Sequence, residues 1–405
     1  MQRVRKRASK QEVLSLLDPL IAEWFDSRFE GLTEPQAYAI PLIHERKSVL
    51  VSSPTGSGKT LTAFTSIINE LFKYAKEGRL EDRIYAVYVS PLKALANDIN
   101  KNLEEPLGQM HELATRKGYG FPQVRVGVRS GDTSPAERQR QLRRPPHIFI
   151  TTPESLALVL TAPKFREKFS QVEYVIVDEI HEICDSKRGA HLSLTLERLQ
   201  ALCQRPITRI GLSATLAPIE DIAAYLVGCQ DGNVRPVEII EVLTKRDLDL
   251  EVMCPTEDMT ALPYEIVNAR MYDMLRDMVN AHRTTLVFTN TRSGTEQVVY
   301  KLRERGIESI EAHHGSLSKE TRLDVEDRLK RGELRCVVSS TSLELGIDIG
   351  SVDLVCQIGS PKSVAKGLQR IGRSGHSVGR TPKGRMIVLD LDDLVAQITL
   401  PTTGA

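Results

Sequence analysis

The chain has 405 residues, of which 41% are apolar and 26% are charged, a composition typical of a folded protein with two or three domains of roughly 100 to 200 residues. It contains no run of about 18 apolar residues, and the basic N-terminus is followed by an amphipathic segment rather than a signal-peptide core. These features argue against a membrane-spanning or secreted protein, and we expect a cytoplasmic one, with nucleoid association as a further option. The net charge of +1 does not by itself indicate a polyanionic partner.

The cysteines and the charge clusters narrow the chemistry further. The six cysteines show no CxxC spacing, which argues against a zinc site and a disulfide framework, and we expect buried, reduced thiols. Basic residues gather in segments 1–10, 129–144 and 361–380. Such a run is usually a solvated face, but the last two segments stand beside the motifs described below and are therefore candidate binding surfaces.

In the first half of the chain, short apolar runs alternate with helix-length amphipathic segments. Strands are expected within 48–53, 84–91, 147–153, 174–179 and 208–215, with helices from Thr60 and Ala94 and another over 154–160. This rhythm is typical of a parallel sheet covered by helices on both faces. Around Asp231 to Asp249 the chain turns to DGN and RP breakers without a clear helix, and this change marks the expected domain boundary.

The same rhythm restarts in the second half. Strands are expected within 284–291, 307–315, 334–341, 354–361 and 384–390, with helices over Thr295 to Arg305 and Lys319 to Lys330. The sequence therefore predicts two α/β domains, residues 1–231 and 232–405, each with a parallel sheet flanked by helices.

The segment SSPTGSGKT at 52–60 lies between an apolar strand and an apolar-patterned segment, the context that a phosphate-binding loop needs. Its glycines allow backbone N–H groups to face phosphate oxygens, Lys59 supplies a point charge, and the Thr60 hydroxyl is a candidate Mg²⁺ ligand. Glycine-rich strand-to-helix turns also have other uses, so the string alone is not decisive. The nucleotide-binding residues expected from this loop are Ser53, Thr55, Gly56, Ser57, Gly58, Lys59 and Thr60.

The segment YVIVDEIH at 174–181 is a buried type of strand that ends in two carboxylates. Asp178 and Glu179 should therefore emerge at the carboxyl edge of the sheet, where α/β folds bind ligands. We expect Asp178 to hold Mg²⁺ and Glu179 to orient and deprotonate the water that attacks the γ-phosphate of ATP. The alternative is an exposed acidic turn after a strand, with His181 merely capping the next element.

With these two motifs in place, the order of the remaining strings resembles superfamily 2 helicases over roughly residues 25–380, which implies two tandem RecA-like P-loop NTPase domains that use ATP. LTEPQ (32–36) is similar to the glutamine motif, which implies that Gln36 reads the adenine edge. GLSAT (211–215) is similar to motif III, which implies that Ser213 and Thr215 couple the acidic pair to nucleic acid, while His181 links the site to the second domain. SSTSLELGIDI (339–349) is similar to motif V, whose expected nucleotide contacts are Gly346 and Asp348.

The DEIH box with the following CDSKRGAHLSLTLERL, the string SPLKALANDI and the ending QRIGRSGH resemble the large-helicase-related (Lhr) family, especially its archaeal members. That resemblance implies an ATP-dependent, DNA-stimulated 3′→5′ translocase implicated in repair, acting on single-stranded or forked DNA. Members of that family carry winged-helix and further C-terminal domains, so the chain is expected to be a truncated or minimal helicase core.

The motif VI string QRIGRSGH (369–376) supplies the expected arginine finger. Its eighth position is His376, where related helicases often have a second arginine, so Arg373 is the main candidate and Arg370 a supporting catalytic contact. A P-loop in one domain and an arginine in the other imply a site that is complete only when the domains close on ATP.

Expected contacts with a nucleic-acid strand follow from the remaining motifs, which include SPLKALAND (90–98), TTPESL (151–156) and VFTNTR (287–292). Most should touch phosphate and sugar, which position a strand without reading its sequence. Structural alternatives stay open, because Thr152 also fits a helix cap, His314 a satisfied core histidine, and Trp24 is expected in the core. The expected contacts are Lys93, Arg129, Thr152, Glu154, Thr289, Arg292, His314, Ser340 and Thr341.

Two competing functions remain at this stage. The motifs are shared with RNA helicases, and discrimination depends on 2′-hydroxyl contacts that the sequence does not expose. An ATP-gated nucleic-acid clamp without processive unwinding is the second alternative, motivated by the missing C-terminal domains. A kinase or transporter ATPase is disfavoured because neither needs LSAT, TSLELGID and QRIGRSG after the acidic box.

Overall fold

In the computed structural model, the described residues are 1–54, 57–121, 123–214, 218–242, 247–258, 262–344, 350–374 and 381–395, and the side chains at 93–95, 97, 98, 101, 102, 319 and 365 lie outside the description. The chain forms two compact units, Met1–Thr244 and Lys245–Ala405. Both are α/β units built on a parallel sheet, as the alternating pattern predicts.

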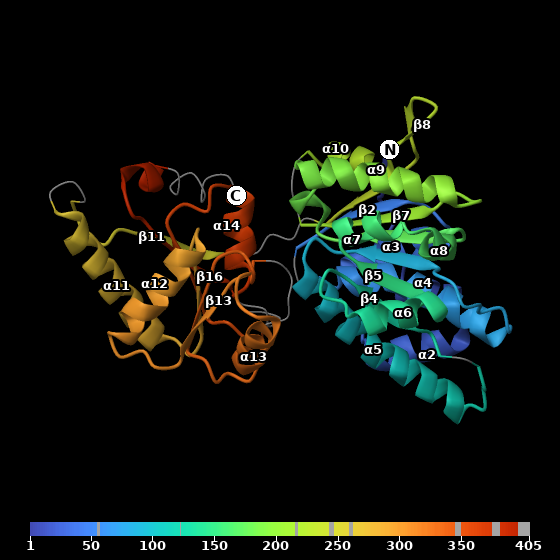
Figure 1. The fold of residues 1–405 in the computed structure, drawn as a ribbon, viewed down its shortest axis with the longest axis horizontal. Helices are drawn as coiled ribbons and strands as arrows, with labels where there is room; N and C mark the ends of the chain where they lie inside the picture. Colours follow the sequence, from blue (N-terminus) through green and yellow to red (C-terminus); the bar gives the residue numbers. More distant parts are fainter. Residues whose placement is uncertain are drawn as a thin grey trace. The chain divides into compact units, whose positions relative to one another are not determined.

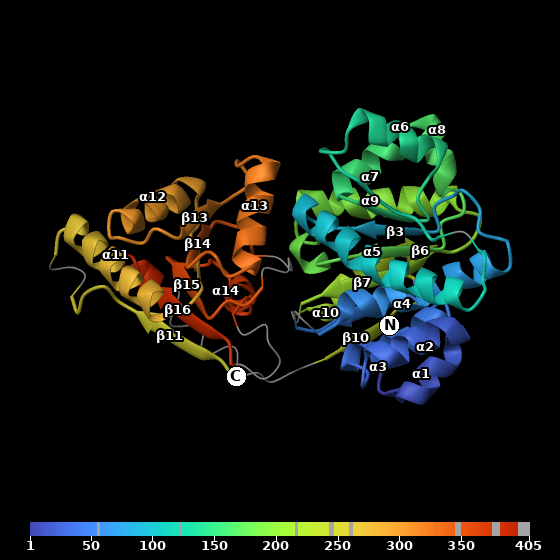
Figure 2. The ribbon, with the colours of Figure 1, turned by 90° about the horizontal axis from the view of Figure 1, so that it is seen from below.

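The first unit contains a sheet in which every neighbouring pair of strands is parallel (Figures 1 and 2). In spatial order its strands are β1 (Gln2–Arg3), β10 (Glu238–Glu241), β2 (Val49–Ser52), β7 (Thr208–Ser213), β6 (Tyr174–Val177), β3 (Ala86–Val89), β5 (Ile148–Thr151) and β4 (Val126–Arg129). A separate antiparallel hairpin pairs β8 (Cys229–Gln230) with β9 (Asn233–Val234).

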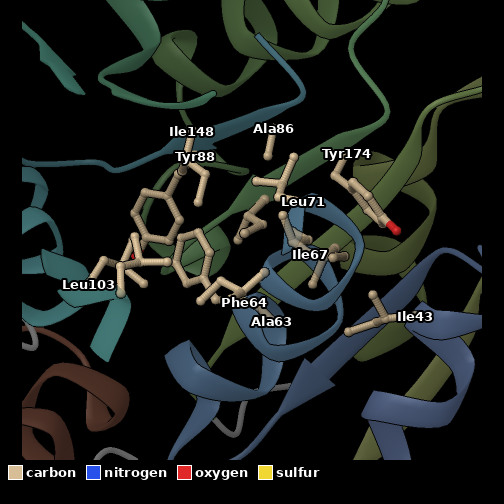
Figure 3. Close-up of a cluster of buried hydrophobic side chains, with 14 of the residues drawn as sticks. Ile43, Ala63, Phe64, Ile67, Leu71, Ala86, Tyr88, Leu103, Ile148 and Tyr174 are labelled. Carbon is tan, nitrogen blue, oxygen red and sulfur yellow. The ribbon is translucent and has the colours of Figure 1, made fainter. Parts of the chain in front are cut away.

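Helices cover both faces of this first sheet, because successive strand residues point to opposite sides. One core packs Phe64 and Ile67 against Tyr88 and Ile148 (Figure 3), and the other packs Val87 against the helices of the opposite face. On the first face lie α1 (Lys10–Leu16), α2 (Pro19–Arg28), α3 (Glu34–His44), α4 (Lys59–Lys76) and α5 (Lys93–Arg116). The remaining elements are α6 (Pro135–Arg143), α7 (Pro153–Val159), α8 (Pro163–Arg166), η1 (Glu167–Phe169), η2 (Ile180–Glu182), α9 (Lys187–Leu202) and α10 (Ile219–Val227).

The second unit repeats this plan with a smaller parallel sheet. Its strands in spatial order are β11 (Asp249–Met253), β16 (Lys383–Ile387), β15 (Leu354–Ile358), β12 (Thr285–Phe288), β14 (Cys336–Ser339) and β13 (Ile310–His313). Its helices are α11 (Tyr264–Ala281), α12 (Arg292–Arg303), α13 (Lys319–Lys330) and α14 (Val364–Ile371). Helices α11 and α12 lie together over one face of the sheet, which Figure 1 shows in yellow and orange.

Two expected bounds are corrected by hydrogen bonding. The first unit extends past residue 231, because β10 pairs with β2 in register from Glu238 with Val49 to Glu241 with Ser52. The segment expected to be without a clear helix therefore supplies a strand to the first sheet. Helix α12 begins at Arg292 rather than Thr295, since the Thr291 hydroxyl accepts a hydrogen bond from the Gly294 N–H at 3.0 Å and caps the helix.

Candidate active site and nucleic-acid contacts

The phosphate-loop lysine lies where β2 passes into α4. Gly58 has a left-handed φ of 82°, and a Cβ there would stand 3.3 Å from the Thr33 hydroxyl oxygen, so a glycine is required. Lys59 is only 8% exposed, and its Nζ donates to the carbonyl oxygens of Ser53 at 2.6 Å and Ser213 at 3.1 Å. Both acceptors are neutral, so these bonds hold the ammonium in place without cancelling its charge.

Other loop residues are partly described. The hydroxyls of Ser53 and Ser57 lie 2.8 Å apart, and Thr60 is the partly buried second residue of α4. Thr55 and Gly56 lie outside the described residues. The described part of the loop is thus tied to itself by side-chain and backbone bonds.

Gln36 sits beside this loop on α3. Its Oε1 accepts the Thr33 N–H at 2.9 Å in a capping box, and its Nε2 lies 3.5 Å from where a Gly58 Cβ would stand. The side chain is buried, which fixes its orientation. The oxygen keeps one further lone pair, so the predicted adenine contact stays a prediction that this geometry allows.

The acidic pair stands at the carboxyl end of β6, and both side chains are buried. Asp178 Oδ1 accepts the Glu179 N–H at 2.9 Å, and Asp178 Oδ2 accepts the Tyr88 hydroxyl. Glu179 adopts a left-handed φ of 44°, a conformation that costs on the order of 1–3 kcal/mol in a non-glycine residue and is typical of functional sites.

The two buried carboxylates of this pair favour the binding of a cation. Burial, followed by the neighbouring Glu179 carboxylate, raises the pKa of Asp178 above its ordinary value. Glu179 Oε2 is buried, and no hydrogen bond reaches it from the described part of the chain. Two buried carboxylates, one with an oxygen that no described hydrogen bond reaches, fit a divalent cation, and the Thr60 hydroxyl stays a predicted further ligand.

His181 connects the acidic pair to the strand end at Ser213. Its Nδ1 accepts the Ala214 N–H at 3.3 Å and lies 3.2 Å from the Ser213 Oγ. The same Nδ1 lies 3.7 Å from Glu179 Oε2, and Nε2 lies 3.4 Å from Glu182 Oε1. These contacts lie within the first unit; the predicted link to the second domain stays a prediction, and Thr215 lies outside the described residues.

The residues of the first unit that are predicted to contact nucleic acid differ in the hydrogen bonds and ion pairs that they make within the protein. Thr152 is buried and caps α7, with its hydroxyl 3.4 Å from the Ser155 N, as the structural alternative proposed. Glu154 forms an ion pair with Arg188 at 2.5 Å. The Lys93 side chain lies outside the described residues.

Arg129 is the exception in this group. Its guanidinium lies over the Phe165 ring at 5.2 Å, and its Nη1 is buried without a hydrogen-bond partner among the described residues. Burial lowers the pKa of Arg129, and the nearby Arg138 guanidinium lowers it further. A half-buried cation beside a second cation is a ready site for a phosphate.

The candidate contacts of the second unit are mostly engaged. The buried Thr289 hydroxyl bonds Thr295 Oγ1 at 2.8 Å and the Thr291 carbonyl at 3.0 Å. His314 is buried, with Nε2 2.6 Å from Glu296 Oε1, which matches the alternative of a satisfied histidine.

The other three candidates of this unit are Arg292, Ser340 and Thr341, and two of them are exposed to solvent. Arg292 Nη1 donates to the Ser316 hydroxyl at 2.7 Å and is exposed. Ser340 is buried and Thr341 is exposed directly after β14. Arg292 and Thr341 are therefore exposed to solvent, and their contact with nucleic acid stays a prediction.

Arg370 is fully engaged within the second unit. Its Nε and Nη2 donate to Glu344 Oε2 at 3.1 and 2.7 Å, its Nη1 donates to Gln357 Oε1 at 2.6 Å, and its guanidinium lies 5.1 Å from the Phe288 ring centroid. The supporting catalytic role of Arg370 stays a prediction, and in this structure the buried Glu344 carboxylate neutralises its guanidinium. Arg373 is 1% exposed just after α14. Gly346, Asp348 and His376 lie outside the described residues.

Sequence reasoning missed Tyr88 and Glu344, which hold Asp178 and Arg370. Tyr88 stands in an apolar strand and reads as core, and Glu344 stands inside motif V beside better-known positions. A polar residue within a segment expected to be buried indicates that it has a hydrogen-bond partner, and this was the available signal. Only the fold identifies which residue that partner is.

The remaining expectations concern cysteines, metals and membranes. Cys336 and Cys356 are buried, whereas Cys229 and Cys254 are exposed and Cys184 and Cys203 are intermediate, so the expectation of six buried thiols was wrong. Among the described residues, no group of three or more His, Cys, Asp or Glu side chains is placed to hold a metal by itself, and Trp24 is buried as predicted. No helix in the described part of the chain has the length and hydropathy to cross a membrane.

Comparison with known proteins identifies both units. The DEAD/DEAH box helicase family matches residues 33–222, and the helicase conserved C-terminal domain matches residues 268–377. ATP-dependent helicase Lhr-Core of Methanothermobacter thermautotrophicus is 57% identical over 389 residues, which cover 95% of this chain and 45% of that protein. Lhr-Core of Saccharolobus solfataricus is 49% identical over 395 residues, or 96% of this chain and 44% of that protein. The chain thus spans less than half the length of these relatives.

Solved structures agree with this relationship. The Mycobacterium smegmatis helicase Lhr bound to ssDNA and AMP-PNP superposes with a TM-score of 0.87 and 43% identity, covering 97% of this chain and 50% of that chain. Mss116p bound to ssRNA and AMP-PNP has a TM-score of 0.77 at 21% identity over 96% of this chain and 76% of that chain, and shows the shared fold alone. With two RecA-like units, the helicase motifs in order and these relatives, the chain belongs to the Lhr family of superfamily 2 helicases.

Proposed function

We propose that the chain is the motor core of an ATP-dependent DNA helicase, which couples ATP hydrolysis to movement along a single strand. The observation that carries this proposal is the assembly of Lys59 and the acidic pair around β7. Lys59 bonds the carbonyl of Ser213 at the end of β7, and His181, two residues after Glu179, lies against the same serine. A cation for phosphates and a carboxylate for water thus share one edge of the sheet.

Hydrolysis follows from the charges at this edge. Lys59 exchanges its carbonyl partners for phosphate oxygens, which are stronger acceptors because they are charged. The unbonded Oε2 of Glu179 takes the proton of the attacking water. Mg²⁺, held by Asp178 through water and by the Thr60 hydroxyl, would neutralise phosphate charge when bound.

The second unit contributes Arg373. We propose that its guanidinium stabilises the γ-phosphate charge when the two units close on ATP, and that Arg370 only fixes the helix that presents it. The ion pair of Arg370 with Glu344 ties α14 to motif V and supports this division of roles.

Nucleic acid binds across the first unit at Arg129 in this proposal. A half-buried guanidinium without an acidic partner among the described residues gains most from a phosphate, whereas Glu154 and Thr152 are already occupied. DNA is favoured over RNA because the solved Lhr helicase of 43% identity binds ssDNA. A 3′→5′ direction, a role in repair and a cytoplasmic or nucleoid location follow from the family resemblance and belong to the same proposal.

The test is steady-state ATP hydrolysis by the purified chain without nucleic acid, with single-stranded DNA and with RNA of equal length and sequence. Glu179→Gln is the control, because it keeps the shape of the side chain and removes the base. Stimulation by DNA that Glu179→Gln abolishes supports the proposal. Stimulation by RNA alone would assign an RNA helicase, and binding of DNA without stimulated turnover would assign an ATP-gated clamp.

A further inference from the structure

Tyr88 is a buried tyrosine at the centre of the first sheet that contacts the acidic pair. It lies on β3, which is hydrogen-bonded to β6, and its side chain is completely buried. Its hydroxyl donates to Asp178 Oδ2, while Asp178 Oδ1 accepts the Glu179 N–H. Both oxygens of the carboxylate are therefore engaged by the protein, which fixes the plane of the group.

The tyrosine ring is itself held by the helix that follows the phosphate loop. Phe64 on α4 stacks on Tyr88 with ring centroids 5.4 Å apart and an interplanar angle of 21°, and Figure 3 shows the two rings side by side. Phe64 follows Thr60 by four residues, about one helical turn. Tyr88 thus touches both elements that present the expected Mg²⁺ ligands, α4 with Thr60 and the end of β6 with Asp178.

We infer that Tyr88 is a positioning residue for the metal-binding carboxylate of Asp178. This inference rests on the proposed function, and it adds a residue that none of the helicase motifs includes. A neutral hydroxyl suits the task, because it orients the carboxylate by a hydrogen bond and leaves its negative charge for the cation. A lysine or arginine in the same place would compete with the metal.

The test is the effect of Mg²⁺ on nucleotide binding by the full chain carrying Tyr88→Phe, which keeps the ring and its stacking and removes only the hydroxyl. Binding of a fluorescent methylanthraniloyl-ADP is measured in EDTA and over a Mg²⁺ titration. We expect unchanged affinity in EDTA and a Mg²⁺ concentration for half-saturation raised by roughly 10-fold, the scale of lost outer-shell support at a metal.

Tyr85→Phe is the matched control. Tyr85 is also buried, directly before β3, and its hydroxyl accepts the Glu81 N–H at 2.9 Å, away from the acidic pair. The Tyr85 hydroxyl also donates to the Arg79 carbonyl at 3.3 Å, so each variant loses the hydrogen bonding of a buried hydroxyl and thermal unfolding should report a small loss of stability in both. A Mg²⁺ response that is unchanged in Tyr88→Phe, or reduced equally in both variants, would overturn the inference.

The readout also separates this inference from the proposed function. It needs neither hydrolysis nor DNA, so a chain that binds Mg²⁺-ADP normally but shows no nucleic-acid-stimulated turnover would refute the motor and leave the role of Tyr88 to be decided by the two variants. A wild-type chain whose nucleotide binding ignores Mg²⁺ would overturn both.

Discussion

The carboxyl edges of the two sheets carry similar polar side chains that are partnered in different ways. Within the described residues of the first unit, Glu179 Oε2 and Arg129 Nη1 are buried without a hydrogen bond. In the second unit, Arg370 makes a buried ion pair with Glu344 at 2.7 Å, and His314 lies 2.6 Å from Glu296.

We use this difference as a criterion. Buried polar groups without a hydrogen-bond partner are expected to bind a ligand, whereas fully bonded groups are expected to stabilise the fold. A buried charged group without a partner is costly, so it persists where a ligand supplies the partner. A fully bonded network instead makes one arrangement of a segment rigid. By this criterion we expect the first edge to bind ATP and nucleic acid, whereas Arg370 ties α14 to Glu344 of motif V and His314 is held by Glu296 of α12.

The largest expected effect comes from Lys59→Ala, which removes the cation of the phosphate loop. ATP hydrolysis should fall to background, because no other cation of the loop can neutralise the β and γ phosphates. Steady-state turnover with single-stranded DNA measures this. Lys73→Ala, on the same helix but partly exposed, should keep wild-type turnover. Equal turnover in the Lys59 variant would refute the assignment of the loop.

Arg373→Ala should leave ATP affinity nearly intact and lower turnover by roughly 10³-fold, the scale of arginine fingers. Nucleotide binding and single-turnover hydrolysis together separate the two quantities. Arg335→Ala provides a control, since that arginine is exposed and its guanidinium donates to Asn280 Oδ1 at 3.4 Å. Lost affinity with intact turnover would contradict the role.

Arg370→Ala tests the structural side of the comparison. The substitution leaves the buried Glu344 carboxylate without its ion-pair partner, and the free energy of unfolding of the second unit should fall by about 3–5 kcal/mol. Calorimetry of the full chain measures this as a shift of one transition. Replacing both partners with leucine should recover most of the loss, because no buried charge then remains.

Two outcomes qualify this prediction. Arg303→Ala, which breaks a half-exposed pair with Glu311, should cost less than about 1 kcal/mol. If Arg370→Ala were as stable as the wild type yet inactive, Arg370 would be a catalytic contact after all.

Arg129→Ala should give the smallest effect, a loss of single-stranded DNA affinity of about 10-fold at low salt. The slope of log affinity against log salt should fall by about 0.7, the value for one phosphate contact on a single strand. Fluorescence anisotropy over a salt series measures both. Arg140→Ala is the matched control, because that exposed arginine is already paired with Glu137 at 2.8 Å. An equal loss in both variants would show a diffuse surface effect instead of a site at Arg129.

Local patterns predicted much of this fold. The strands around Leu50, Val175 and Val337 were placed correctly because a parallel sheet buried on both faces demands short apolar runs. Helix α13 was predicted with its observed bounds, since Ser318 caps its start and charged residues mark its exposed face. The phosphate loop was found because it is contiguous in sequence.

Errors arose where a long-range pairing decided the outcome. The boundary near residue 231 was placed too early, because the strand β10 follows breakers and finds its partner β2 far back in the chain. The burial of the cysteines could not be predicted from the sequence either, since Cys229 lies on an exposed hairpin while Cys356 lies in the sheet of the second unit.

The sequence by itself determined that this chain is a helicase core with a phosphate loop and an acidic pair, because contiguous motifs and a regular strand rhythm are local properties. Only the tertiary structure decided which polar groups are engaged: Tyr88 on Asp178, Glu344 on Arg370, and no partner for Arg129 Nη1 among the described residues. The physical reason is that a hydrogen bond or ion pair depends on distances of about 3 Å between residues far apart in sequence, and the sheet order that sets those distances is a property of the whole fold.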